Sequence, residues 1–171
     1  MTATPIPRSL ALTAYGDMDM STIKEKPIGR RHIKTYVLPH SKINEVLLSV
    51  ERAIKNSALI YWVCPMIENS ENEDLIAVNE RFDFLTSFFP NIDISLVHGK
   101  QNQSDKEKAI NDFKVGKSKI LVATTVIEVG VDIPDATIMV IECAERFGLS
   151  QIHQLRGRVG RSNKELSLIH I

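Results

Sequence analysis

The chain has 171 residues, of which 43% are hydrophobic and 25% charged, as in an ordinary globular domain. Its 21 basic and 21 acidic residues give a formal net charge of zero. The overall charge therefore does not indicate nucleic-acid binding, and any site for a polyanion has to be a local cluster of positive charge. No apolar run is long enough to predict a membrane span, and no secretory signal is visible. We expect a cytoplasmic protein.

The N-terminal segment lacks a regular hydrophobic period. Residues 1–8 predict a loop, because Pro5 and Pro7 restrict the residues before them to extended conformations. Arg8–Tyr15 predicts a short helix, and residues 17–30 suit a linker. The chain begins like a piece from the middle of something larger.

From His32 onward, strand-like and helix-like patterns alternate. Helix starts are predicted at Ser41, at Ser104 in a capping box with Glu107, and at Ser150. The acidic stretch 68–74 predicts a loop. The expected strands are Ile33–Leu38, Ala58–Cys64, Ile92–Val97, Lys119–Thr124 and Ala136–Glu142. The expected helices run from Ser41 to about Asn56, from Leu75 to Phe89, from Ser104 to Val115 with Gly116 at the end, and from Ser150 through an arginine-rich stretch.

Strands that are apolar on both faces and alternate with helices predict an α/β fold with a parallel β-sheet flanked by helices. Ligands of such sheets bind beyond the carboxyl ends of the strands. The candidate residues are therefore expected along one edge, where the strand ends are Cys64-Pro65, His98-Gly99, Thr124-Thr125 and Glu142-Cys143.

The two cysteines and five histidines indicate no metal site. Cys64 and Cys143 are far apart in the sequence, each in an apolar run, and are expected to be buried free thiols in a reducing compartment. The histidines are scattered without a metal-binding spacing. We expect no metal ligands in this chain.

The stretch Gln154–Arg161 concentrates arginine and glycine. On a helix, Gln154, Arg158 and Arg161 lie at i, i+4 and i+7 and share one face. That face carries an amide and two forked guanidinium groups, which suit phosphate oxygens. Its two glycines each cost a helix about 1 kcal/mol, so a close approach of another backbone or a ligand is expected there. A solvated basic helix end is the alternative.

Val122–Ala136 places two hydroxyls at the end of a buried strand, followed by a turn with acidic residues. Hydroxyl and backbone N–H groups at strand ends commonly contact phosphate, and an acidic side chain can accept hydrogen bonds from a ribose or an arginine. An ordinary turn explains the pattern equally well. The residues concerned are Thr124, Thr125, Glu128, Gly130 and Asp132.

His98-Gly99 also follows a strand, where a glycine lets a phosphate approach the backbone, although a plain turn explains the pair better. Gly116-Lys117-Ser118 imitates a phosphate-binding loop, but Asn111 stands where that loop needs glycine, and a strand follows instead of a helix. No other segment supplies a phosphate-cradling loop or an Asp-Glu pair for magnesium. The chain is therefore expected to lack the principal nucleotide site.

Three segments resemble motifs III, V and VI of superfamily 2 helicases, in order and suitably spaced: Thr2–Arg8, Val122–Ala136 and Gln154–Arg161. More narrowly, residues 2–17, 63–71 and 124–132 resemble the RecG family, bacterial ATP-dependent helicases that remodel branched DNA in recombination and repair. The resemblance covers residues 1 to about 165. The transcription-repair coupling factor shares part of it, but Tyr15-Gly16-Asp17 followed by Pro27-x-Gly29-Arg30 favours RecG. A non-catalytic nucleic-acid-binding module on a helicase-like fold is the other alternative.

The resemblance implies a division of the chain. Residues 1–16 would be the tail of a first motor domain, 17–30 a linker, and 31–165 a second RecA-like motor domain. Residues 166–171 do not resemble the family's continuation; a foreign tail and a strand both stay open for them. Gln101 stands where the family more often has Met.

In this family ATP and Mg²⁺ bind between two motor domains, and the resemblance carries the family's roles onto matching positions. Arg158 and Arg161 would reach the γ-phosphate. Nucleotide binding would involve Gln154, Gly130, Asp132 and Glu128. Contacts with DNA would come from Thr124, Thr125, His98 and Gly99. Coupling of nucleotide state to DNA grip would fall to Thr2, Ala3, Thr4 and Arg8. The Mg²⁺ ligands lie outside this chain. Implied partners are branched or forked DNA and, in the same protein, a first RecA-like domain and a wedge domain, in a monomer without membrane contact.

Overall fold

The computed structural model describes residues 32–65, 71–124, 133, 135–159 and 166–171, with the side chains of 71–75 left aside. The loop, helix and linker expected over residues 1–30 lie outside these ranges. Within them, six strands form one sheet in which every neighbouring pair is parallel. The strand order is β1-β6-β5-β2-β4-β3. The strands are β1 (Ile33–Val37), β2 (Leu59–Val63), β3 (Ile94–Val97), β4 (Ile120–Ala123), β5 (Ala136–Ile141) and β6 (Leu166–His170).

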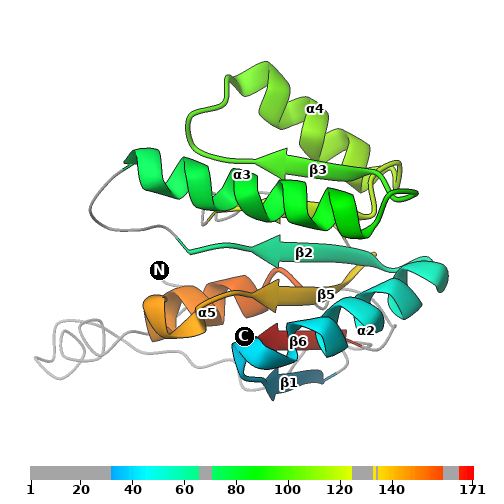
Figure 1. Cartoon of the computed structure of the whole chain (residues 1–171), viewed down its shortest axis with the longest axis vertical. Helices are drawn as coiled ribbons and strands as arrows, with labels where there is room; N and C mark the ends of the chain where they lie inside the picture. Colours follow the sequence, from blue (N-terminus) through cyan, green and yellow to red (C-terminus); the bar gives the residue numbers. More distant parts are fainter. Residues whose placement is uncertain (1–31, 66–70, 125–132, 134, 160–165) are drawn as a thin grey trace, which may run out of the picture.

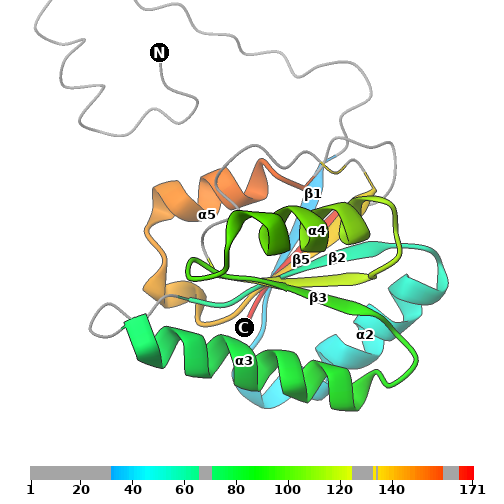
Figure 2. The ribbon, with the colours of Figure 1, turned by 90° about the horizontal axis from the view of Figure 1, so that it is seen from above.

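The helices cover both faces of the sheet, as Figure 2 shows, with α2 and α3 on one side and α4 and α5 on the other. The predicted parallel sheet flanked by helices is confirmed. The helices are α2 (Ile43–Lys55), α3 (Glu71–Phe88), α4 (Gln103–Lys114) and α5 (Leu149–Arg156), with short 3-10 turns η1 (His40–Lys42) and η3 (Ala144–Arg146).

The centre of the sheet is apolar on both faces. Every residue of β2 and of β4 is buried, because helices cover these strands above and below. Tyr61 and Phe113 belong to the core on the α4 and α5 side, and Trp62 to the core on the α3 side. The continuous apolar runs seen in the sequence therefore form the middle of the sheet, where Figure 1 shows β2 and β5 side by side.

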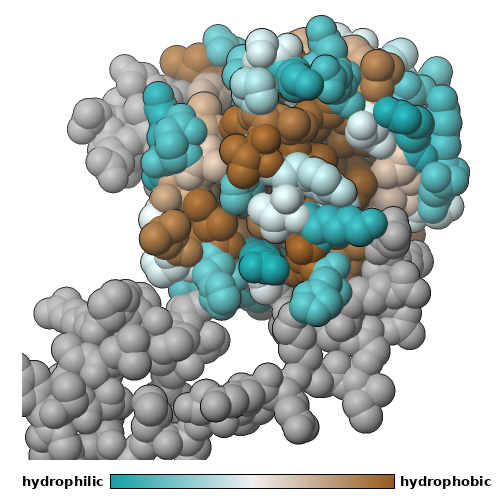
Figure 3. All heavy atoms as spheres, turned by 90° about the horizontal axis from the view of Figure 1, so that it is seen from below, coloured by the Kyte–Doolittle hydropathy of each residue, from teal (hydrophilic) through white to brown (hydrophobic). Residues whose placement is uncertain are grey.

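The edge of the sheet at β1 is different. Tyr36 is 47% and Val37 78% exposed, and Figure 3, which views the molecule from the β1 side, shows apolar side chains among polar ones on this face. β6 lies between β1 and β5. Residues 166–170, which the sequence sets apart as a tail, thus form a strand inside the sheet.

The predicted helix caps are wrong by one or two residues. Ser41 lies inside η1, and Lys42 precedes α2. Asn102 rather than Ser104 caps α4, because its side chain accepts a hydrogen bond from the backbone N–H of Asp105 at 2.8 Å. Gly148 rather than Ser150 precedes α5. The end of α4 is as predicted, since Gly116 follows it with a left-handed φ of 74°.

Two other expectations fail at helix ends. α3 begins at Glu71, so residues 71–74 belong to a helix and not to a loop; acidic residues suit a helix N-terminus because of its partial positive charge. α5 ends at Arg156, and Arg158 lies in the turn that follows. Gln154 and Arg158 therefore do not share the face of one continuous helix. Arg161 lies outside the described residues.

Both cysteines are free, as expected, but only Cys64 is buried; Cys143 is half-buried. Among the described residues, no helix is long and apolar enough to cross a membrane.

Candidate functional site

The carboxyl ends of β3 and β4 bring two predicted residues together. The strands pair with Val97 opposite Ala123, so His98 and Thr124 follow neighbouring positions at the same edge. The backbone N–H of Thr124 donates to the carbonyl of Val97 at 3.3 Å, and the Thr124 residue is almost completely buried. Little of the Thr124 surface is therefore open to a ligand at this edge.

The turn after β3 is held by side chains that bond to its backbone. Gln101 Oε1 accepts from the N–H of His98 at 3.1 Å, and Gln101 Nε2 donates to the carbonyl of Leu96 at 3.1 Å. Lys106 Nζ donates to the carbonyl of Gly99 at 2.8 Å. Gln101 is thus a structural residue of this turn. The sequence pattern singled it out only as a departure from the resembled family.

His98 lies among positive charges. Burial first, and then Lys106 and Lys100, lower its pKa, because both effects disfavour the charged imidazolium. Its Nδ1 atom is buried and makes no hydrogen bond. The His98 ring therefore lies beside two lysines, which make a local positive region in a chain whose formal net charge is zero.

The arginine-rich stretch is anchored through apolar side chains. Leu155 and Val159 are buried in the core under β5 and β6, while Gln154 is exposed and Arg158 half-buried. The Arg158 N–H donates to the carbonyl of Leu155 at 2.9 Å. The buried side chains of Leu155 and Val159 therefore anchor this segment to the core, while Gln154 at the end of α5 and Arg158 in the following turn keep part of their surface exposed.

Gly157 fits this tight turn for a steric reason. A Cβ atom at this position would lie 3.1 Å from the carbonyl oxygen of Gln154, tighter than most real contacts of this kind. The close approach expected from the sequence is therefore made by the chain's own backbone.

Several predicted site residues fall outside the described ranges, and their roles stay predictions. They are Thr2, Ala3, Thr4, Arg8, Thr125, Glu128, Gly130, Asp132 and Arg161.

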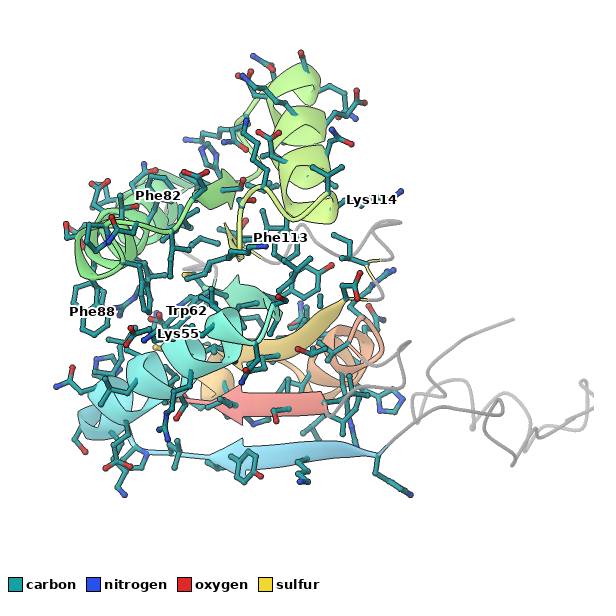
Figure 4. All side chains as sticks on the ribbon, turned by 90° about the vertical axis from the view of Figure 1, so that its right-hand side faces the viewer. Lys55, Trp62, Phe82, Phe88, Phe113 and Lys114 are labelled. Atoms are coloured by element: carbon teal, nitrogen blue, oxygen red, sulfur yellow. The ribbon has the colours of Figure 1, made fainter. Side chains whose placement is uncertain are left out.

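A polar cluster at the ends of β2 and β5 was not predicted. Glu142 is 7% exposed and accepts a hydrogen bond from the indole Nε1 of Trp62. Arg81 of α3 contacts the same carboxylate twice: its Nη2 donates to Oε2 at 3.0 Å, and its Nε lies 2.6 Å from Oε1, outside hydrogen-bond geometry. Figure 4 shows Trp62 inside the molecule, close to the sheet. The one sequence signal was an acidic residue directly after an apolar strand.

A cavity of about 370 Å³ opens beside this cluster. Its lining comes from the ends of β2 and β5, from α3 and from η3. The guanidinium of Arg81 lies 5.0 Å from the ring centroid of Phe84, which is 40% exposed. The lining residues are Cys64, Pro65, Ala77, Glu80, Arg81, Phe84, Glu142, Cys143 and Arg146. In the described part of the chain, no three His, Cys, Asp or Glu residues form a group that could hold a metal ion.

Comparison with known proteins gives a consistent picture. The family model described as "Helicase conserved C-terminal domain" matches residues 42–163. The chain is 49% identical over 168 residues to "ATP-dependent DNA helicase RecG" of Streptococcus pneumoniae serotype 4, covering 96% of the chain and 25% of the relative. It is 50% identical over 165 residues to the RecG of Aquifex aeolicus, covering 96% of the chain and 21% of the relative.

Solved structures agree. The structure of RecG bound to a three-way DNA junction matches with a TM-score of 0.77 and 40% identity, over 99% of this chain and 22% of that one. The structure of S. cerevisiae Dbp5 bound to RNA and ADP BeF3 matches with a TM-score of 0.66 over 99% of this chain and 43% of that one, but at 17% identity it shows the fold alone. The predicted RecA-like fold and the resemblance to RecG are confirmed. The chain spans a quarter or less of the length of these RecG relatives.

Proposed function

The chain belongs to the family of the helicase conserved C-terminal domain, and from this premise we propose that it is the second motor domain of a RecG-type, ATP-dependent DNA helicase. The observation that carries the proposal is the similarity to RecG at 49% identity over 96% of the chain. On this proposal, residues 1–16 end the first motor domain, 17–30 link the two, and the protein acts as a monomer on branched or forked DNA in the bacterial cytoplasm, in recombination and repair.

We assign Arg158 and Arg161 to the γ-phosphate of ATP bound between the two motor domains. The described arginine, Arg158, suits this role because buried Leu155 and Val159 anchor the backbone on either side of it in the turn after α5, and a guanidinium is a forked donor for phosphate oxygens. Bound ATP with Mg²⁺ supplies the phosphoryl group, and the arginines stabilise the charge that develops on it. Gln154, Gly130, Asp132 and Glu128 would bind the rest of the nucleotide. Thr2, Ala3, Thr4 and Arg8 would couple its state to DNA.

We assign DNA contacts to Thr124, Thr125, His98 and Gly99. The described three lie at the neighbouring ends of β3 and β4, and two lysines, Lys100 and Lys106, lie beside His98 there. Of these two lysines, Lys100 lies in the turn itself and Lys106 in the first half of α4. Positive side chains and backbone N–H groups are the usual contacts of a DNA backbone. RecG has been seen on a three-way junction, and we propose branched DNA for this chain as well.

The proposal predicts that the chain hydrolyses almost no ATP by itself. The lysine and the magnesium-binding carboxylate of phosphoryl transfer would come from the first motor domain. The test mixes the chain with a separately expressed first motor domain and measures ATP hydrolysis with and without forked DNA.

We expect activity only in the mixture, and a loss of about a thousandfold in Arg158→Ala or Arg161→Ala, the scale of an arginine that stabilises the transition state. Arg156→Ala is the matched control, because Arg156 is exposed at the end of α5 and outside the assigned set. Equal losses in all three variants would contradict the assignment. Silence in a mixture shown to associate would favour a non-catalytic binding module.

A further inference from the structure

The cavity between α3 and the ends of β2 and β5 lies at a special place in the topology. β2 is followed by α3 on one face of the sheet, and β5, its neighbour, is followed by α5 on the opposite face. Adjacent parallel strands whose connections leave to opposite faces open a crevice at their carboxyl ends, and ligands of α/β proteins bind in such crevices. Cys64 and Pro65 follow β2, and Glu142 and Cys143 follow β5, so the cavity occupies this crevice.

The charges of the lining cancel. Two are acidic, Glu80 and Glu142, and two are basic, Arg81 and Arg146. Glu142 is buried and already bound by Arg81 and Trp62, which leaves exposed Glu80 and Arg146 as one acceptor and one donor at the rim. A site built for a free phosphate would carry an excess of positive charge, so this lining favours an uncharged group that both donates and accepts hydrogen bonds.

The walls favour a flat ring. Phe84 is partly exposed, the guanidinium of Arg81 lies against it, and Pro65 and Ala77 add apolar surface. Aromatic rings and guanidinium planes are the groups on which unstacked bases lie in complexes with single-stranded nucleic acid. The volume of about 370 Å³ is at the lower end of the range for ligand pockets, about 300–1,000 Å³, and suits one ring system with its sugar.

We propose that this cavity is a subsite for one unstacked nucleobase of a DNA strand, held between Phe84 and the rim pair Glu80 and Arg146. The inference rests on the proposed function and deepens it, since it names a part of the strand that is read through its base rather than its phosphate. The hydrogen-bonding edge of the base meets Glu80 and Arg146, and its face meets the aromatic wall.

The chain carries its own reporters of this cavity. It has one tryptophan, and the indole N–H of Trp62 donates to Glu142 in the cavity wall. It has two cysteines, and both line the cavity. Burial, followed by the carboxylate of Glu145, raises the pKa of the Cys143 thiol, so alkylation of Cys143 should be followed at alkaline pH.

The experiment adds a short single-stranded oligonucleotide to the 171-residue chain and follows the NMR signal of the Trp62 indole N–H together with the rate of Cys143 alkylation. A strand of the same length without bases, and inorganic phosphate, are added in parallel. We expect the base-bearing strand to shift the Trp62 signal and to slow alkylation, and the abasic strand and phosphate to do neither. An equal response to the abasic strand would show a phosphate site and overturn the inference, as would no response to any of them.

Phe84→Ala and Phe88→Ala form a matched pair. The two residues lie one turn apart on α3 and are 40% and 39% exposed, but only Phe84 lines the cavity. We expect Phe84→Ala to weaken binding of the base-bearing strand about fivefold to a hundredfold, the range of one stacked base, and Phe88→Ala to leave it unchanged. Equal effects would overturn the inference.

These outcomes separate the two proposals. If the mixed motor domains hydrolyse ATP with DNA but the Trp62 signal stays still, the cavity assignment fails and the helicase assignment stands. If the Trp62 signal shifts but the mixture hydrolyses no ATP, the helicase assignment fails and the cavity stays a base-binding site.

Discussion

The turns that follow β3 and β5 lie at the same edge of the sheet but are held by different forces. After β3, side chains of Gln101 and Lys106 bond to the backbone within a few residues of the turn. After β5, the buried carboxylate of Glu142 is bound by Trp62 and Arg81, which are 80 and 61 positions away in the sequence. The first turn is a local unit whose bonds water can replace, and the second is part of the core. Substitutions should therefore cost much more after β5 than after β3.

Glu142→Ala should have the largest effect. It leaves the guanidinium of Arg81 and the indole N–H of Trp62 without their acceptor in a mostly dry region, and breaking such a buried pair costs about 3–5 kcal/mol. Urea unfolding measures the loss. Glu142→Gln keeps an acceptor for Trp62 and should lose less.

Glu45→Ala is the surface control for this comparison. Glu45 pairs with Lys42 at 3.4 Å, with both side chains largely exposed, and such pairs contribute about 0.5 kcal/mol or less. If Glu142→Ala costs no more than Glu45→Ala, the β5 turn is not tied to the core.

This contrast also explains what the sequence could and could not predict. The sheet was predictable because a continuous apolar strand such as Leu59–Val63 indicates a strand that is buried on both faces. That His98 and Thr124 lie at one edge follows from the predicted parallel direction of the strands, and the structure adds that their strands are neighbours. The Glu142 cluster was not predictable, because nothing local to Glu142 says that Arg81 and Trp62 will meet it.

The errors at helix ends have a local cause. Asn102 and Ser104 are both good capping residues, and their types do not decide between them; the direction of the chain after β3 does. Similarly, Gly157 and Arg158 fit a helix by spacing, but α5 ends at Arg156, directly before them. A pattern of residue types fixes that a helix begins or ends nearby and leaves the position open by a residue or two.

Asn102→Ala tests the corrected cap and should have the second-largest effect. Its side chain accepts from the Asp105 N–H at 2.8 Å, and removal of such a cap costs about 1 kcal/mol. Ser104→Ala, two residues inside α4, should change the free energy of unfolding by much less. A larger loss in the serine variant would restore the cap expected from the sequence.

Gln101→Ala sharpens the comparison at the β3 turn itself. It removes the two hydrogen bonds to His98 and Leu96, and because the turn is only half-buried, water should replace them and limit the loss to about 0.5–1 kcal/mol. Gln103→Ala serves as control, since the Gln103 side chain donates to the exposed side chain of Glu107 in the same helix. A loss as large as that of Glu142→Ala would show that the β3 turn, too, is part of the core.

The smallest expected effect is a dependence of the free energy of unfolding on pH, caused in part by His98 in the turn after β3. Burial, Lys106 and Lys100 lower the pKa of His98, and burial lowers that of His170. Below about pH 6.5 the unfolded chain therefore binds more protons at these residues than the folded chain does, so their contribution to stability is complete above that pH and falls on acidification. Urea unfolding at about pH 7.5 and about pH 5.5 should show a smaller loss in His98→Gln than in the unsubstituted chain. His153→Gln, which replaces an exposed histidine of α5, is the matched control. If the two variants behave alike, the charge and burial around the β3 turn do not couple the protonation of His98 to the stability of the fold.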